Sequence, residues 1–317
     1  MRSYTLNKVV QYVIVLVATS VIIFTMVRLG PTDPVAVIVG GKQTSPETIA
    51  AIRHDFKLDR SPVEQYWIWI TGMLHGDFGT SFEYRQPVGF LIKERLPVTA
   101  GIVIMSTLIS VVIAIPTGVI MAVKQHSLLD TGISLVELIL VSSPPFLTSI
   151  LMIWMITVYA PTFSFTGTSQ TFWEFVQRIF LPSLALAFSM IALNANVMKS
   201  GMVEQLHSQF YRVAKAKGLT RTKIVIRHCL RNALIPVITL LGIEIGTLLV
   251  GSVLVENVFS LAGLGSILIN AVQKSDYAMV QGVTMLLVFV FMTISTALDL
   301  VYGLIDPRIR LKRGTVA

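Results

Sequence analysis

Acidic and amide side chains lie inside long apolar stretches of this chain, at Glu137, Asn194, Asn196 and Glu244, and Asp299 directly follows another such stretch. A charge near the centre of a membrane span costs about 2.5–3.5 kcal/mol, so such residues need a partner or a function. Each side chain could line a path for a polar solute, or it could be hydrogen-bonded where two helices pack. Glu137 lies near the expected inner end of its stretch, where it could snorkel, so packing is the simpler interpretation there.

Glu244 stands between Gly242 and Gly246. This spacing of small residues lets another helix approach closely. The pattern is equally compatible with two interpretations of Glu244. Its side chain could be a polar group on a translocation path, or an acid hydrogen-bonded in a helix interface. Asn194 and Asn196, late in their own apolar stretch, are secondary candidates for the path.

No pattern in the sequence predicts a catalytic or metal site. The five histidines are scattered without metal-ligand spacing, at His54, His75, His126, His207 and His228. The glycine-rich run from Val39 to Thr44 fails as a phosphate loop, because Ala36 and Gln43 stand where glycine and a hydroxyl residue are needed. The lone Cys229 can form no internal disulfide.

The composition places these residues in a membrane protein. Hydrophobic residues make up 54% and charged residues 13% of the 317, with a mean hydropathy of +0.74. That balance excludes an ordinary soluble enzyme and a disordered chain. A span needs about 20 apolar residues. Six stretches qualify: Val9–Val27, Leu96–Val123, Thr131–Ala160, Ile179–Met198, Asn232–Val255 and Tyr277–Leu298.

Local features refine two of these spans. The first is longer than a signal peptide core and no small-residue cleavage site follows it, so we expect a retained helix. Proline deletes backbone hydrogen bonds, so Pro144 and Pro145 predict a kink in the third span and Pro116 predicts one in the second.

The charge distribution predicts the topology. The N-terminal tail, the Lys124–Asp130 loop, the Lys199–Arg231 loop and the C-terminal tail carry +2, 0, +7 and +3, which makes +12 on one face. The opposite face is close to neutral, and the whole chain carries +8. Basic loops stay in the cytoplasm, so both termini are expected there. Nucleic-acid binding is not needed to explain the basic excess.

Two extramembrane segments have helical patterns. Outside, a helix is expected over Ser45–Phe56, capped by Ser45, and another over Val63–Leu74, whose aromatic cluster fits the membrane interface. This outer segment could be a packed cap that anchors the first span, or it could contact a partner.

The basic inner loop is expected to form two short helices joined at Gly218. The first covers Ser208–Lys217, with Phe210, Val213 and Ala214 on one face, and the second covers Arg221–Ala233 after a Thr220 cap. Pro236 is expected to mark the return to the membrane. This compact protrusion could dock on a partner.

Short motifs in order along the chain give it a family likeness. They lie at Gly30–Pro34, Leu58–Tyr66, Gly76–Ser81, Ala214–Leu219 with Leu230–Pro236, Glu256–Gly265, Asp276–Gly282 and Asp306–Arg310. Together they resemble the permease subunits of bacterial ABC importers for oligopeptides, dipeptides and nickel, along nearly the whole chain. Arg212 and Val213 replace acidic and alanine residues of the broader importer signature, and Ala262 and Ala278 replace two prolines.

The resemblance implies an all-α, type I ABC importer permease fold with six transmembrane helices. Residues 1–29 would form a cytoplasmic tail and the first helix, and residues 30–95 a small helical extracytoplasmic segment. Residues 96–304 would form the transmembrane core, with the coupling loop at 199–232, and residues 305–317 a cytoplasmic tail. The protein would lie in a bacterial or archaeal cytoplasmic membrane.

The resemblance also assigns roles to residues. ATPase coupling would involve Arg212, Ala214, Lys215, Ala216, Lys217, Gly218, Leu219 and Pro236. Contact with a binding protein, or an outer gate, would involve Glu256, Asn257, Phe259, Gly263, Gly265 and Asp276. The implied partners are a sister permease, two ATP-binding subunits, an extracytoplasmic solute-binding protein and the bilayer. This chain would bind no cofactor, while ATP and Mg²⁺ would sit on the ATPases.

The cargo stays open between peptides, nickel and a metal chelate. Nickel-type members of the family are slightly favoured by Asn194, Asn196 and the Glu256–Asn257 pair. A different class of function is a secondary transporter driven by an ion gradient, with Glu137, Glu244 and Asp299 as ion sites. Such transporters usually show internal repeats, and this sequence shows no duplicated halves.

Overall fold

The computed structural model describes residues 2–29, 35, 39, 44–55, 57–159 and 171–305, without the side chains of residues 2–5, 7 and 299–305. The Gly30–Pro34 and Asp306–Arg310 motifs, Phe56, the C-terminal tail and the Asp299 side chain lie outside this description. The chain forms two compact units, Met1–Thr99 with Ala262–Ala317, and Ala100–Leu261. The division into four segments expected above follows membrane topology, so it stays a prediction.

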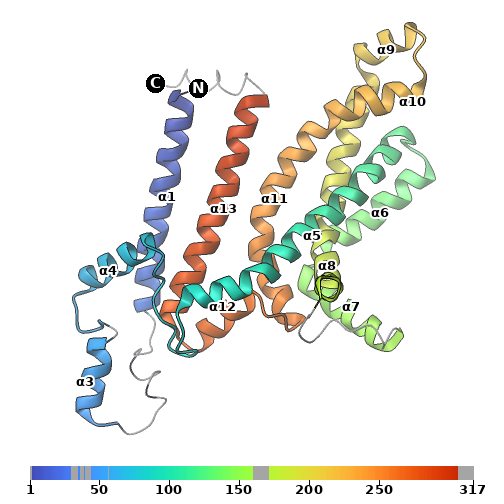
Figure 1. Ribbon diagram of the computed structural model, residues 1–317. Coiled ribbons are helices and arrows are strands. Elements are labelled where there is room, and N and C mark those ends of the chain that lie inside the picture. The colour runs from blue at the N-terminus through green and yellow to red at the C-terminus, as the bar shows by residue number, and fades with distance from the viewer. Residues whose placement is uncertain are drawn as a thin grey trace. The chain divides into compact units, whose positions relative to one another are not determined.

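The first unit contains the two ends of the chain. Its helices are α1 (Arg2–Arg28), α3 (Pro46–Asp55), α4 (Pro62–Leu74), the start of α5 (Val88–Val123), α12 (Leu264–Gln273) and α13 (Tyr277–Ile305). The helices α1 and α13 lie side by side, and α4 crosses α1 (Figure 1). Its core joins Val88, Leu91 and Ile92 of α5 to the apolar faces of α12 and α13.

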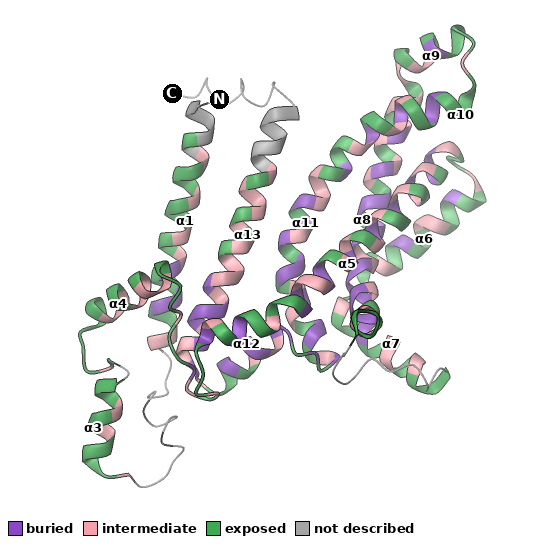
Figure 2. Cartoon of the chain, in the orientation of Figure 1, coloured by how far each residue is buried: buried purple, intermediate pink, exposed green. Residues whose placement is uncertain are grey.

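The second unit is built around one long helix. It holds the rest of α5, α6 (Leu128–Ser142), α7 (Pro145–Tyr159), α8 (Phe172–His207), α9 (Gln209–Ala216), α10 (Arg221–Ile224), the π-helical turn η1 (Val225–Cys229) and α11 (Leu230–Val258). The helices α6, α7 and α11 all pack on α8, and buried residues follow α8 along much of its length (Figure 2). Gly118 of α5 also meets α8 at backbone distance, since a β-carbon there would lie 2.5 Å from the Ala195 carbonyl oxygen.

Local signals start several of these helices where expected. Ser45 Oγ accepts from Thr48 N at 3.3 Å and begins α3, as its sequence predicts. A capping box begins α4, in which Ser61 Oγ accepts from Glu64 N at 3.3 Å and Glu64 Oε2 accepts from Ser61 N at 3.2 Å. Both outer helices predicted from the sequence are therefore confirmed.

The membrane spans agree with the expected fold. Among the described residues, five helices are long and apolar enough to cross a membrane, namely α1, α5, α8, α10–α11 and α13. The helices α6 and α7 are apolar enough only when taken together, and the chain bends by 104° between Ser142 and Pro145, so the pair is either a broken sixth span or a re-entrant loop. The kink predicted from Pro144 and Pro145 is confirmed, whereas α5 continues as one helix past Pro116.

Candidate functional site

The basic segment between α8 and α11, residues 199–232, is built on the ends of these two helices. The helix α8 runs on to His207, and Ser208 Oγ accepts from Tyr211 N at 3.2 Å to begin α9. After α9 the chain turns at Gly218, whose φ of +80° is the left-handed conformation that glycine adopts without strain. The helix predicted over residues 208–217 is confirmed, and so is the left-handed turn predicted at Gly218.

A hydrophobic cluster fastens α9 to the two helices. It joins Ala214 to Met198 and Met202 of α8 and to Ile224, Val225, Cys229, Ala233 and Val237 on the other side. The predicted apolar face is only partly right, because Phe210 and Val213 are half exposed while Ala214 is buried. Phe210 packs edge-on against His228, with ring centroids 5.3 Å apart.

The second half of the segment corrects the sequence-based expectation. Arg221–Ala233 is not a separate short helix, because α10, η1 and α11 form one continuous helix from Arg221 to Val258. Thr220 occupies the cap position, but its side chain makes no capping hydrogen bond. Pro236 lies inside this helix rather than at a break. The wide π turn at Val225–Cys229 links the polar end to the apolar span without a hinge.

Most residues assigned to ATPase coupling lie on the surface. Ala214 is buried and Leu219 half-buried, and the exposed members are Arg212, Lys215, Ala216, Lys217, Gly218 and Pro236. A shallow hollow lies between α9 and the end of α8, lined by Leu206, His207, Tyr211, Arg212, Lys215 and Ala216. The segment thus presents a basic surface with apolar side chains beside it.

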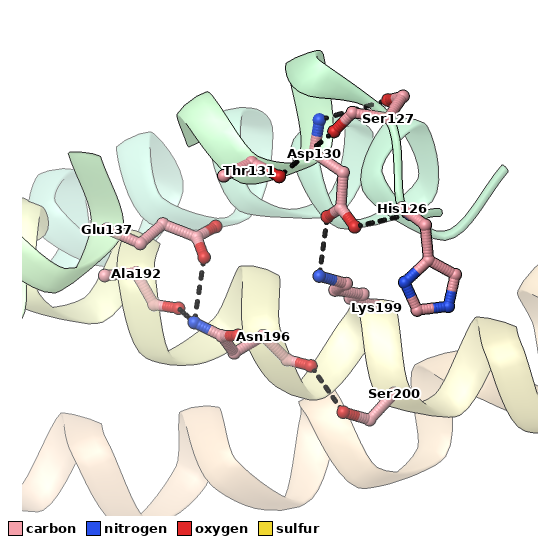
Figure 3. A network of polar contacts seen from close by, with 9 residues as sticks. All are labelled: His126, Ser127, Asp130, Thr131, Glu137, Ala192, Asn196, Lys199 and Ser200. Atoms are coloured by element: carbon pink, nitrogen blue, oxygen red, sulfur yellow. Dashed lines mark hydrogen bonds and ion pairs between the residues drawn. The ribbon is translucent and has the colours of Figure 1, made fainter. Parts of the chain in front are cut away.

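The four path candidates form two pairs across helices. Asn194 Nδ2 donates to Glu244 Oε2, which joins α8 to α11, and both side chains are buried. Asn196 Nδ2 donates to Glu137 Oε2 at 2.8 Å, which joins α8 to α6 (Figure 3). Within this chain, each acid is therefore hydrogen-bonded in a helix interface.

A second polar link between α6 and α8 was not predicted. Lys199 Nζ lies 2.5 Å from Asp130 Oδ1, and Asp130 Oδ2 accepts from His126 N at 3.0 Å (Figure 3). Ser127 Oγ caps the same turn by accepting from Asp130 N at 3.2 Å. The only sequence signal was a pair of opposite charges at the ends of two predicted spans, 69 positions apart, and such a signal does not specify contact.

The outer residues fall in both units. Glu256 and Asn257 end α11, with Glu256 buried and Asn257 exposed, and Phe259 is buried directly after it. In the other unit, Gly263 begins α12, and Gly265 is buried in its first turn.

Asp276 holds two distant motifs together. Its buried carboxylate accepts from Ser81 Oγ, from Glu83 N at 3.2 Å and from Met279 N at 3.2 Å. Asp276 thus ties the Gly76–Ser81 motif to the start of α13. Elsewhere in the first unit, a hydrogen bond from the His54 imidazole, 3.0 Å away, lowers the pKa of the exposed Asp59 carboxyl.

The described residues contain no group of three or more His, Cys, Asp or Glu side chains that could hold a metal ion. The chemistry visible in that part of the chain is hydrogen bonding and ion pairing between helices, together with the basic surface of the 199–232 segment.

Known proteins resemble this chain over its whole length. Residues 114–311 match the family described as binding-protein-dependent transport system inner membrane component, and residues 1–103 match the N-terminal family of such membrane components. A putative peptide transport system permease protein of Brucella abortus is 33% identical over 98% of this chain and 99% of its own length. The dipeptide transport system permease protein DppB of Escherichia coli is 31% identical over 99% of this chain and 100% of its own.

Proposed function

This chain belongs to the binding-protein-dependent transport system inner membrane components, the permease subunits of ABC importers, and on that premise we propose that it forms half of a path for peptides. It is a multi-pass inner membrane protein and a transport subunit rather than an enzyme, since ATP hydrolysis belongs to separate subunits. The relatives named for peptides and dipeptides support a peptide cargo over nickel or a metal chelate.

The proposed assembly contains the partners expected from the resemblance. A sister permease supplies the other half of the path, and two cytoplasmic ATPases with ATP and Mg²⁺ drive alternating access. An extracytoplasmic binding protein delivers the cargo to the face that carries Glu256, Asn257, Phe259, Gly263, Gly265 and Asp276. Both termini lie in the cytoplasm. The +12 charge of the face that carries the two tails and the Lys199–Arg231 loop favours this orientation.

The coupling proposal rests on how the 199–232 segment is packed, with a basic exposed surface above a buried hydrophobic cluster. The exposed surface of α9 offers Arg212, Lys215 and the half-exposed Val213 to a partner. Beneath that surface, Ala214 packs into the cluster that joins α8 to α11. Movement of α9 by the ATPases would therefore pull on both long helices, because a packed cluster transmits displacement instead of absorbing it.

In this proposal the polar pairs lie where α8 meets its neighbours. Repacking of α8 against α11 would expose the Glu244–Asn194 pair to the path in one state and close it in another. The same proposal places Glu137 and Asn196 nearer the coupling segment. The rival gradient-driven transporter needs Glu137 and Glu244 to bind ions, whereas an amide donor already engages each of them.

Gly218 offers a sharp test of the coupling proposal. A β-carbon there meets no atom within 4 Å in the described part of the chain, so a substitution acts through the backbone and through the partner. Left-handed backbone costs a residue other than glycine about 1–2 kcal/mol, and Asn tolerates it better than β-branched Val. We expect Gly218→Val to shift the turn population by about fivefold to thirtyfold and to lower peptide uptake per ATP hydrolysed, with Gly218→Asn as the milder control.

The assay uses the whole importer in proteoliposomes, with the sister permease, ATPases and binding protein present. Uptake of a labelled dipeptide and phosphate release are measured on the same vesicles. Undiminished uptake per ATP in Gly218→Val would overturn the coupling proposal. Uptake of nickel instead of dipeptide by the native importer would overturn the cargo proposal while leaving coupling intact.

A further inference from the structure

Among the described residues, one apolar stripe of α4 is left largely exposed. Val63, Trp67, Ile70 and Leu74 follow the helical spacing of four, three and four residues, so they share one side of α4. Val63 is 67% exposed, Trp67 61% and Leu74 80%. Figure 2 accordingly shows much of α4 as exposed. An extramembrane helix in water would not normally carry three such side chains together.

Residues outside this stripe fix α4 to α1. Tyr66 OH hydrogen-bonds Ser20 Oγ at 2.8 Å, and the Tyr66 ring packs edge-on against Phe24 with centroids 5.3 Å apart. Gln65 Oε1 accepts from Nε of Arg28 at 3.1 Å at the end of α1. These contacts set the rotation of α4 about its axis, so its stripe has a defined direction.

A cavity of about 530 Å³ lies between α1, α4 and α13. Its walls are almost wholly apolar and include Val13 and Val17 of α1, Ile70 of α4, and Met285 and Phe289 of α13. The single polar side chain in the wall, Ser20, already donates to the Val17 carbonyl oxygen at 2.7 Å. A polar ligand would therefore find no hydrogen-bonding group to receive it.

The position of this cavity decides its occupant. Both α1 and α13 are membrane spans, and Val13 and Val17 lie well inside the Lys8–Arg28 span. The cavity is thus continuous with the hydrocarbon that surrounds these helices, where a water-soluble partner has no access. Apolar stripes with Trp are typical of helices that lie in the bilayer interface.

We propose that α4 lies in the membrane interface at the Arg28 end of α1, and that α1, α4 and α13 hold one acyl chain of a phospholipid from that leaflet in this cavity. The stripe sits in the hydrocarbon boundary, and the Arg28–Gln65 side of α4 faces the aqueous layer. The lipid fills the space between the two spans and supports the crossing of α4 over α1.

Spin labels on α4 test the orientation in the complete importer, reconstituted in phosphatidylcholine nanodiscs. Cys229 is the single cysteine and is 1% exposed, so the native chain serves as the labelling blank. We expect labels at Val63→Cys and Leu74→Cys to collide with oxygen and to be shielded from a water-soluble nickel chelate. The control Ile68→Cys, on the side of Arg28 and Gln65, should show the reverse. Shielding of the stripe from both reagents would assign it to a protein partner, and chelate access would assign it to water; either result overturns the proposal.

A photoactivatable phosphatidylcholine with a diazirine in its acyl chain tests the cavity. Cross-links should concentrate on Met285, Phe289 and the neighbouring turn of α1. Val17→Trp should reduce their yield at least threefold by filling the cavity. The control Val15→Trp adds the same bulk to an exposed α1 residue outside the lining and should leave the yield unchanged. Equal yields in both variants, with ATP hydrolysis intact, would overturn the lipid site.

Discussion

The contact of α5 with α8 at Gly118 leads to a quantitative prediction. A β-carbon at this position would lie 2.5 Å from Ala195 O, 2.6 Å from Met198 Cβ and 3.0 Å from Lys199 N. Favourable contacts between such atoms begin near about 3.5 Å. Two of the three obstacles are backbone atoms of α8, which cannot rotate away. Even alanine therefore forces the two helices about 1 Å apart.

The cost of Gly118→Ala follows from two opposing terms. Overpacking of a close-packed interface costs about 1–3 kcal/mol, and rigid backbone obstacles favour the upper end. Replacing glycine by alanine within a helix stabilises the folded state by about 0.5–1 kcal/mol. The net destabilisation is about 2 kcal/mol, which corresponds to a fall of roughly 4–8 °C in the unfolding midpoint of a unit this size.

The buried Cys229 supplies the assay, because it lies in the same unit as Gly118 and belongs to the cluster that includes Met198. A maleimide dye that fluoresces on reaction reports the temperature at which this thiol becomes accessible in detergent. Gly132→Ala is the matched control, since a β-carbon at Gly132 in α6 meets nothing within 4 Å. That control should be neutral, or more stable by about 0.5–1 kcal/mol.

The prediction is refuted if Gly118→Ala unfolds at the same temperature as the native chain while Gly132→Ala is neutral or more stable. That pair of results would mean that α5 and α8 are not in backbone contact in the membrane. A fall of equal size in both variants would point to a general intolerance of alanine at helical glycines.

Further substitutions probe the polar links, and those within the second unit are measured by the same thermal assay. Lys199→Met removes the cation beside Asp130, whose Oδ2 keeps the His126 N–H donor, and should destabilise by about 1–3 kcal/mol. Lys199→Met combined with Asp130→Asn should recover much of that loss. A double variant no more stable than the single would show that the ion pair is not coupled. Asp276→Ala strands three donors and should cost about 3 kcal/mol, with Asp276→Asn milder, as measured by loss of folded protein on urea titration. Asn194→Leu removes the donor to Glu244 and should cost about 1–3 kcal/mol, while Glu244→Gln keeps an acceptor and should cost under about 1 kcal/mol. Equal stability of those last two variants would contradict the observed pairing.

Features set by neighbouring residues were predictable. The Ser45 cap, the left-handed Gly218 and the bend before Pro145 each depend on a few adjacent positions. A side-chain cap or a ring-locked φ acts within one turn of helix, so its signal is complete in the local sequence.

Helix ends without a local stop signal were predicted less well. The polar, basic composition of the 221–231 stretch suggested a separate helix, yet it continues into α11. Pro236 misled the prediction because proline is tolerated inside long membrane helices when the freed carbonyl finds another partner. Packing of Ile224 and Cys229 against α8 holds this end in place, and that packing is a tertiary property.

The sequence by itself determined that this is a helical membrane protein, where most of its spans lie, and that a basic segment joins two of them. These properties follow from hydropathy and charge, which each stretch carries without reference to any other. Only the tertiary structure decided that Glu244 meets Asn194 and that Asp276 meets Ser81, because these partners are 50 and 195 positions apart. An apolar span is compatible with many neighbours, and helix packing selects the one that leaves each buried acid with a donor.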